Sequence, residues 1–317
     1  MRQIKVALVG AGYMATEHAK AFDGLPGVKL VGIYSRTRDR ADLLAEKYSG
    51  MIVCDSVTDL YEKTQADLVI VTVKELSMGA VAKECFDFSW AVLLEKPAGY
   101  NLKDATSILE AANKSQSKVY VALNRRAYSS TRQALSRLEK DPEFRFVKVM
   151  DQQDQIAAKE IYNEPPEVVY NYMFANSVHL IDYFRVFCRG EVLSVLPLIP
   201  WSPDNPGVVL SKIEFSSGDI GLYEGIWNGP GPWAVSISTA QERLELKPLE
   251  QVTLQIRGER KVMNLDIDID DSLFKPGLRY QASQAIAAVR GEINSMPTLS
   301  DSWQSMKLVA KIFNLDG

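Results

Sequence analysis

The chain has 317 residues, of which 46% are hydrophobic, so it is long enough for about two domains that each bury a core. Its 36 Lys and Arg against 40 Asp and Glu give a net charge of -4, which excludes the broad positive field that recruits nucleic acid or an anionic membrane surface. Cys54, Cys85 and Cys188 are odd in number and widely spaced, which argues against a disulfide framework and a zinc site. With only two histidines and no apolar leader or membrane-length apolar run, we expect a cytoplasmic protein that binds no metal.

The first stretch, IKVALVGAGYMATEHAKAF at residues 4–22, predicts a buried parallel strand that turns into a helix. Gly10, Gly12 and Ala15 form G-x-G-x-x-A, in which the glycines permit a tight turn and the close approach of a pyrophosphate. The helix start then faces the phosphates with its free N–H groups. The pattern predicts dinucleotide binding, with an ordinary strand-helix turn as the alternative. The contacts expected at this turn are Gly10, Gly12, Tyr13 and Met14.

Strand and helix patterns alternate from there to residue 124. Further strands are predicted at 28–35, 51–55, 66–73, 90–94 and 118–124, and helices at 39–48, 57–63, 75–86 and 102–115. This alternation predicts a doubly wound parallel sheet over residues 1–124, with ligand bound at the carboxyl ends of the strands.

The end of the second strand bears on the choice between NAD and NADP. A chain that selects NAD usually carries an acidic residue there, whereas this chain has Ser35 and Arg36, followed by Arg40 in the next helix. Guanidinium groups and a hydroxyl suit a 2′-phosphate, so we expect these three residues to bind the cofactor and to favour NADP(H) over NAD(H). The alternative is that the arginines only solvate a helix start and that Asp39 holds a ribose.

From residue 125 the pattern changes to a succession of strands. Strand-like segments lie at 144–155, 190–201, 208–217, 220–227, 233–248 and 252–268, and helices are predicted at 130–140, 172–188, 280–289 and 300–313. This predicts an α+β domain over residues 125–317 with a large, mostly antiparallel open sheet. The uncovered face of such a sheet can pair with another subunit, so we expect a homo-oligomer.

Four motifs in this order resemble one enzyme family. They are GAGYMA near residue 10, Glu95-Lys96-Pro97 after the fifth strand, Asn124-Arg125-Arg126 after the sixth, and SVHLIDYF at 177–184. The chain resembles the glucose-fructose oxidoreductase, inositol dehydrogenase and rhizopine-catabolism family (Gfo/Idh/MocA) over essentially its whole length. The resemblance implies an N-terminal Rossmann domain and an NAD(P)-dependent oxidoreductase acting on a sugar, a keto-sugar or a nucleotide-sugar.

The resemblance also implies roles for single residues. It makes Lys96 a catalytic, substrate-orienting lysine, His179 a proton donor or acceptor, and Asn124 a contact near the nicotinamide. A general acid/base beside the carbinol oxygen is what hydride transfer requires, and a lysine at the end of a strand is well placed for it. Cofactor contacts are expected also from Thr72, Val73, Glu95 and Lys96. His179 lies among apolar neighbours, so a buried structural role is the alternative for it.

The chain departs from the family pattern at two places. The acidic residue that commonly stands four before the histidine is Ala175 here, with Asn176 next to it, so the usual proton relay is incomplete. The Thr-Pro-x-x-x-His that often follows the fourth strand is here Thr72-Val73-Lys74-Glu75-Leu76-Ser77, which indicates a divergent branch.

The substrate is expected to be a small molecule, a sugar derivative bound by hydroxyl-recognising side chains. The expected substrate contacts are Lys96, Arg125, Tyr162, Asn176 and His179, with Tyr128, Gln153, Gln155, Tyr172 and Trp227 as further candidates. Two alternatives remain: an imine or linear tetrapyrrole reductase on the same fold, and a non-catalytic regulatory protein that binds a dinucleotide and a sugar.

Overall fold

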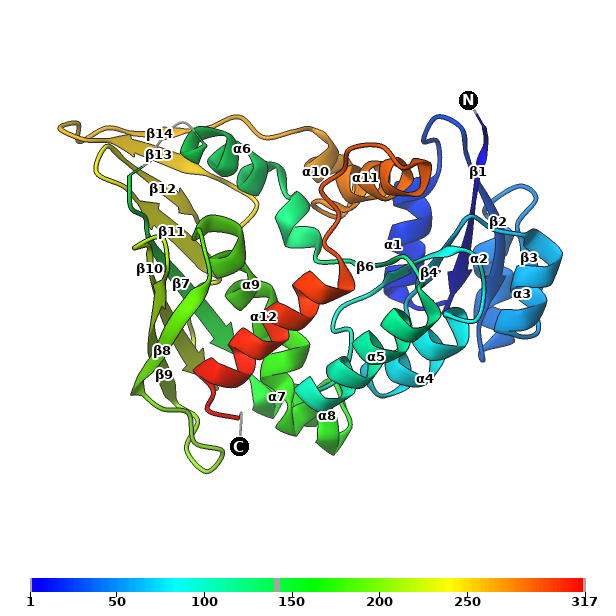
Figure 1. The fold of residues 1–317 in the computed structure, drawn as a ribbon, viewed down its shortest axis with the longest axis horizontal. Helices are drawn as coiled ribbons and strands as arrows, with labels where there is room; N and C mark the ends of the chain where they lie inside the picture. Colours follow the sequence, from blue (N-terminus) through cyan, green and yellow to red (C-terminus); the bar gives the residue numbers. More distant parts are fainter. Residues whose placement is uncertain (1, 140–142, 316–317) are drawn as a thin grey trace. The chain divides into compact units, whose positions relative to one another are not determined.

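The computed structural model describes residues 2–139 and 143–315, and the chain divides into two compact units (Figure 1). Unit 1 comprises the chain up to Asn124 together with Ser272–Trp303, and unit 2 comprises Arg125–Asp271 and the chain from Gln304. The first boundary lies where the strand-helix alternation ends. The predicted division did not foresee that residues 272–303 return to unit 1.

Unit 1 contains the predicted doubly wound parallel sheet. Its strands are β1 (Ile4–Val9), β2 (Val28–Tyr34), β3 (Ile52–Cys54), β4 (Leu68–Val71), β5 (Ala91–Leu94) and β6 (Val119–Val121). They lie in the order β3-β2-β1-β4-β5-β6, and each neighbouring pair is parallel. The order reverses between β1 and β4, and this switch point is where ligands bind in open α/β sheets.

Helices cover both faces of this sheet because successive side chains of each strand point to opposite sides. The helices are α1 (Tyr13–Phe22), α2 (Arg38–Ala45), α3 (Val57–Thr64), α4 (Glu75–Cys85), α5 (Leu102–Ser115) and α11 (Leu278–Arg290). Ile4, Val6 and Leu8 of β1 pack in one apolar cluster with α1, α2 and α11, whereas Ala7 and Val9 pack in another with α3, α4 and α5. Helix α11 therefore completes a face that the N-terminal segment leaves partly open.

Unit 2 is built on an eight-stranded sheet. Its strands are β7 (Phe146–Gln153), β8 (Val192–Ile199), β9 (Val208–Phe215), β10 (Ile220–Trp227), β11 (Ala234–Ser238), β12 (Glu242–Leu246), β13 (Thr253–Ile256) and β14 (Val262–Asn264). They lie in the order β14-β13-β12-β11-β7-β10-β9-β8. All neighbours are antiparallel except β7 and β10, which are parallel, so the sheet is mostly antiparallel as predicted.

Side chains alternate between a covered and an open face in the central strands. In β7 the buried positions are Val147, Val149, Asp151 and Gln153, and helix α9 packs on this strand. The helices of this unit are α6 (Ser129–Leu138), α7 (Gln155–Glu160), α8 (Pro166–Tyr170) and α9 (Val178–Phe187), and a π-helix, η2 (Met173–Ser177), leads into α9. The helix η1 (Asn124–Ala127), a 3₁₀ turn, joins the two units in sequence.

Several predicted bounds needed correction. The strand predicted to reach residue 124 ends at Val121, and the short helices α7 and α8 were not foreseen. Two further helices, α10 (Asp270–Leu273) and α12 (Leu299–Ile312), each cross a boundary between the two units in the sequence. The end of the helix predicted at 130–140 lies outside the described residues. Within the described ranges, every helix is too short or too polar to span a bilayer.

Candidate active site

The turn between β1 and α1 uses its two glycines differently. Gly10 has a φ of +105°, and a Cβ at this position would lie 2.6 Å from the carbonyl oxygen of Thr72, so the backbone itself requires glycine. Around Gly12, by contrast, a Cβ would meet no described atom within 4 Å. Gly12 therefore borders open space at the switch point of the sheet, where a phosphate group can approach the backbone.

The start of α1 leaves its N–H groups available to a ligand. Gly12 is its N-cap residue, no described side chain caps it, and the first turn carries no acidic residue. Tyr13 is 66% exposed, with the Lys275 ammonium 5.3 Å from its ring centroid, whereas Met14 packs against the core. A helix N-terminus in this state attracts anions, so these residues fit the pyrophosphate of a dinucleotide.

The arginines after β2 differ in their ion pairs. Arg38 forms ion pairs with Asp42 and with Asp55, at 3.2 and 2.5 Å. Arg36 forms no ion pair with any described residue, and its Nη2 donates to Ser77 Oγ at 3.2 Å. Both Arg36 and Arg40 are exposed, while the Ser35 hydroxyl accepts the Thr37 N–H at 3.2 Å. Arg36 thus keeps its positive charge available for an anionic ligand.

Glu95 and Lys96 follow β5 at the same carboxyl edge of the sheet. The Glu95 carboxylate is buried, with one oxygen 2.8 Å from His18 Nε2 of α1 and the other accepting the backbone N–H of Lys96 at 3.0 Å. These contacts fix the backbone that carries Lys96, whose side chain is half-buried. The sequence did not indicate the His18–Glu95 pair, because its members are 77 positions apart.

Other expected cofactor contacts have structural partners. Thr72 follows β4, and its hydroxyl donates to the Val9 carbonyl at 3.2 Å, while Val73 packs against the core. Asn124 is buried, and its amide donates to the carbonyl of Pro276 at 3.1 Å. Asn124 therefore ties the end of the N-terminal segment to the segment that returns to unit 1.

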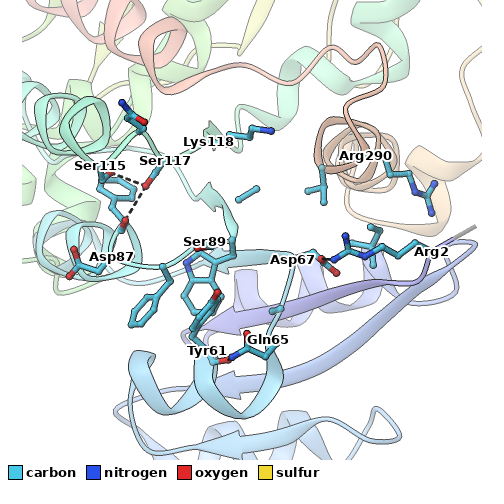
Figure 2. Close-up of a pocket in the computed structure, with 18 residues that line it drawn as sticks. Arg2, Tyr61, Gln65, Asp67, Asp87, Ser89, Ser115, Ser117, Lys118 and Arg290 are labelled. Carbon is cyan, nitrogen blue, oxygen red and sulfur yellow. Dashed lines mark hydrogen bonds and ion pairs between the residues drawn. The ribbon is translucent and has the colours of Figure 1, made fainter.

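A cavity of about 970 Å³ opens at the opposite edge of the same sheet (Figure 2). It is lined by residues at or next to the amino ends of strands, among them Ile4, Asp67 and Lys118, and an Arg2–Asp67 ion pair lies at its border. Because ligands of doubly wound sheets bind at the carboxyl ends, this cavity is not the expected cofactor site.

In unit 2, four side chains form a continuous hydrogen-bonded chain. The Tyr223 hydroxyl donates to one oxygen of Asp151 at 2.8 Å, and the Gln153 amide donates to the other at 2.5 Å. The Asn176 amide then donates to the Gln153 carbonyl oxygen at 2.8 Å. Tyr223, Asp151 and Gln153 are buried, whereas Asn176 is partly exposed.

Arg125 lies close to this chain. Its guanidinium stacks on Trp233, with 4.6 Å from Cζ to the ring centroid, and its positive charge opposes the burial that raises the pKa of Asp151. The loop that carries Trp233 is fixed to β7, because the indole N–H donates to the Gln152 carbonyl at 2.6 Å and the Gln152 amide donates to Gly229 at 2.9 Å. The Nε and Nη1 atoms of Arg125 are buried without a hydrogen-bond partner among the described residues, which leaves donors for an anion or a hydroxyl.

His179 lies buried on α9, next to the π-helix that carries Asn176. Asp182, three residues further on, accepts two hydrogen bonds from Arg126, at 2.7 and 2.6 Å, and one from the Ser305 hydroxyl at 2.5 Å. Asp182 therefore joins η1, α9 and α12.

Within unit 2, the structure brings together three of the expected substrate contacts. Arg125 and Asn176 both adjoin the hydrogen-bonded chain of Asp151, and His179 follows on the next turn of helix, whereas Lys96 belongs to unit 1. Tyr162 is 65% exposed in the loop after α7. Next to that loop, Gln155, Tyr170 and Trp201 help to line a cavity of about 470 Å³.

Two members of the polar chain, Asp151 and Tyr223, were not predicted from the sequence. The signal was present, because the alternation in FVKVMDQQ places Asp151 on the same face as Val147 and Val149. A carboxylate on the apolar side of a strand has to find partners, which marks it as a residue to examine.

Comparison with known proteins shows which family the N-terminal part of the chain is similar to. Residues 4–123 match the family model GFO_IDH_MocA, described as an oxidoreductase family with an NAD-binding Rossmann fold. YceM of Salmonella typhimurium, provisionally named an oxidoreductase, is 29% identical over 139 residues, which are 44% of this chain and 44% of that protein. The match thus spans less than half of the relative's length.

Solved structures share the fold over nearly the whole chain. UDP-N-acetylglucosamine 3-dehydrogenase GnnA of Acidithiobacillus ferrooxidans has a TM-score of 0.79 at 13% identity, covering 99% of this chain and 98% of its own. The WlbA dehydrogenase of Chromobacterium violaceum, in complex with NADH and UDP-GlcNAcA, has a TM-score of 0.73 at 18% identity, covering 99% and 94%. At these identities the likeness establishes the fold.

Proposed function

We propose that the chain, whose residues 4–123 match the Gfo/Idh/MocA oxidoreductase family model, is a member of that family and transfers hydride between a nicotinamide cofactor and a sugar. The reacting group is the carbinol or carbonyl of a sugar, a keto-sugar or a nucleotide-sugar. The observation that carries the proposal is the open start of α1 at Gly12, beside the switch point of a parallel sheet.

The cofactor preference is proposed to be NADP(H) over NAD(H). Arg36 supports it, since this exposed guanidinium has no carboxylate partner among the described residues, while Arg38 is paired twice. A dianionic 2′-phosphate would receive a charge-assisted hydrogen bond there. Ser35 and Arg40 stand on either side in sequence.

Lys96 is proposed as the acid/base. The nicotinamide supplies or accepts the hydride, and Lys96 Nζ gives a proton to the carbonyl oxygen in reduction or takes it from the hydroxyl in oxidation. Glu95 keeps the Lys96 backbone in place through its contacts with His18 and the Lys96 N–H. In unit 2, Arg125, Asn176 and His179 recognise substrate hydroxyls.

We propose a homo-oligomer formed through the sheet of unit 2. The edge strand β8 exposes several large apolar side chains, with Leu193 67%, Leu196 54% and Leu198 49% exposed. Apolar side chains of this size on an edge strand favour pairing with a second sheet.

The proposal is tested by turnover. Purified protein is incubated with NAD⁺ or NADP⁺ and UDP-N-acetylglucosamine or myo-inositol, and the absorbance of reduced nicotinamide is followed. Lys96→Met is expected to lower kcat at least about a hundredfold while cofactor affinity stays unchanged, since general acid-base catalysis contributes about 10²–10⁴. Full activity of Lys96→Met on the sugar would show that Lys96 is not the acid/base, and cofactor binding without turnover of either substrate would favour a regulatory protein.

A further inference from the structure

The hydrogen-bonded chain of unit 2 runs from the buried face of the sheet to the π-helix η2. It joins Tyr223 on β10, Asp151 and Gln153 on β7, and Asn176 on η2. Asp151 is 1% exposed and Gln153 is 1% exposed, so water does not compete for these contacts. The chain therefore transmits a defined donor and acceptor order from the core to Asn176.

That order follows from the chemistry of the groups. An ionised carboxylate only accepts hydrogen bonds, so Gln153 has to turn its NH₂ group toward Asp151. Its carbonyl oxygen then faces Asn176 and has to receive an N–H. Asn176 in turn has to use its NH₂ group on Gln153, which leaves its carbonyl oxygen as the acceptor for other partners.

The surroundings of Asp151 affect the pKa of its carboxyl group in opposite directions. Complete burial raises the pKa of Asp151, and the adjacent Ser177 hydroxyl, the hydrogen bonds from Tyr223 and Gln153 and the charge of Arg125 each offset part of that rise. The same environment raises the pKa of Tyr223 through burial and through the neighbouring carboxylate, so Tyr223 remains a donor. Tyr223, Gln153 and Arg125 thus all support the accepting form of Asp151.

The end of the chain lies on an unusual helix. Single π-helical turns are rare in proteins, and those that occur often lie at functional sites. Here the π-turn spans Met173–Ser177 and carries Asn176 directly before α9. Tyr172 precedes this turn, and burial raises the pKa of its phenol while the neighbouring Asn176 side chain lowers it, so the Asn176 amide lies close to the Tyr172 side chain.

We propose that Asp151, acting through Gln153, orients the Asn176 amide so that its carbonyl oxygen accepts a hydrogen bond from a substrate hydroxyl. Asp151 is then a positioning residue and Asn176 a specificity residue for a polyhydroxylated ligand. The substrate contact depends on the proposed function, whereas the orientation of the amides does not.

The test is a cycle of Asp151→Asn, Asn176→Asp and the double variant, measured first by thermal unfolding without ligand. Asn176→Asp alone places two acceptors opposite each other and is expected to lower Tm by about 2–4 °C. In the double variant, the amide introduced by Asp151→Asn can donate to Gln153, whose reversed amide then donates to the carboxylate introduced by Asn176→Asp. The double variant is therefore expected to regain most of the loss.

The second readout is steady-state kinetics with UDP-N-acetylglucosamine. Asp151→Asn is expected to raise KM about tenfold with a smaller change in kcat, because the reversed amides present an NH₂ group to the substrate hydroxyl. The double variant is expected to restore KM, because the carboxylate at position 176 again offers an acceptor. Cofactor affinity is expected to stay the same throughout.

The matched control pairs Asn176→Asp with Asp219→Asn, which removes another buried carboxylate of unit 2, one that is bonded to Arg189 rather than to Gln153. The effects of these two substitutions on Tm are expected to be additive. Asn176→Asp having the same effect on Tm in both the wild-type and the Asp151→Asn background would overturn the proposal. A wild type that does not turn over the sugar counts against the proposed function, while the unfolding cycle still decides the orientation.

Discussion

At the scale of single residues, the two glycines of the first turn have separate reasons to be glycine. Gly10 is required by its positive φ and by the Thr72 carbonyl, both of which belong to the protein. Gly12 has an ordinary φ of -87° and open space where a Cβ would stand. The protein itself therefore does not require glycine at position 12, and we attribute this glycine to the bound ligand.

Substituting the two glycines separates folding from binding. Gly10→Ala is expected to lower the free energy of unfolding by about 2 kcal/mol or more, from overpacking and left-handed strain. Gly12→Ala is expected to leave Tm unchanged and to weaken dinucleotide binding at least about tenfold, because a methyl group would keep the pyrophosphate from the backbone. Thermal unfolding and calorimetric titration measure the two effects. A Gly12→Ala variant that binds as tightly as the wild type would place the cofactor elsewhere.

The local conformation of single residues could be predicted where it depends on neighbouring sequence. Gly10 and Ala15 could be interpreted because strand, turn and helix are contiguous. The partners of Glu95 and Asp151 could not be predicted, because His18 and Tyr223 stand 77 and 72 positions away. One sequence does not report which distant polar groups meet.

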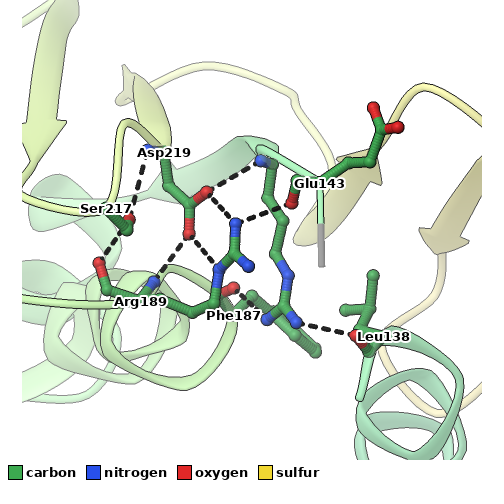
Figure 3. A network of polar contacts seen from close by, with 7 residues as sticks. Leu138, Glu143, Phe187, Arg189, Ser217 and Asp219 are labelled. Carbon is green, nitrogen blue, oxygen red and sulfur yellow. Dashed lines mark hydrogen bonds and ion pairs between the residues drawn. The ribbon is translucent and has the colours of Figure 1, made fainter. Parts of the chain in front are cut away.

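At the scale of elements, a buried ion network holds the strands of unit 2 to a helix end (Figure 3). Asp219, just before β10, accepts the backbone N–H groups of Arg145 and Arg189, each at 2.8 Å, and the Arg189 guanidinium at 2.8 and 3.0 Å. Arg145 donates in turn to the Leu138 and Phe187 carbonyls. The network thus joins the ends of α6 and α9 to the sheet.

This network predicts an acid-sensitive component of stability. Burial alone would raise the pKa of Asp219, but the hydrogen bonds from Arg189 and Arg145 outweigh it and lower the pKa to about 2. A lowered pKa stabilises the fold above the unfolded value of about 4, and this contribution is lost as the pH falls from about 4 to about 2. It is worth about 2 kcal/mol, at about 1.4 kcal/mol per pKa unit.

The measurement is urea unfolding of the wild type and Asp219→Asn between pH 2 and pH 7. The variant is expected to be less stable at pH 7 and to approach the wild type near pH 2. The control is Ser194→Ala, which removes an exposed hydrogen bond to Glu214. A constant difference at all pH values would show that the Asp219 charge does not contribute.

Element prediction worked best for long periodic segments and worst for short ones. The buried strands of unit 1 read as apolar runs, and the predicted helix at 102–115 matches α5 residue for residue. The helices α7 and α8 span only six and five residues, too few for a period to register. The return of α11 to unit 1 depends on tertiary packing, which no local pattern reports.

At the scale of the whole molecule, the exposed apolar strand β8 predicts assembly. Wild-type protein is expected to sediment as a dimer or larger homo-oligomer, and Leu196→Glu is expected to reduce its mass to that of a monomer, because a charge on the apolar edge opposes pairing. Analytical ultracentrifugation at several protein concentrations measures the oligomeric state. Leu43→Glu, at a similarly exposed leucine in unit 1, is the control. A monomeric wild type would remove the expected interface.

We propose that the β1–α1 turn binds a phosphorylated nicotinamide dinucleotide, and that Arg36 selects it. The direct measurement is calorimetric titration of the cofactor-stripped protein and of Arg36→Ala with NADPH and with NADH. We expect NADPH to bind the wild type at least about tenfold more tightly than NADH, a difference of about 1.4 kcal/mol, and Arg36→Ala to remove this preference without weakening the binding of NADH. Equal or tighter binding of NADH to the wild type would contradict the selectivity, and binding of neither dinucleotide would contradict the proposed nicotinamide-dependent function.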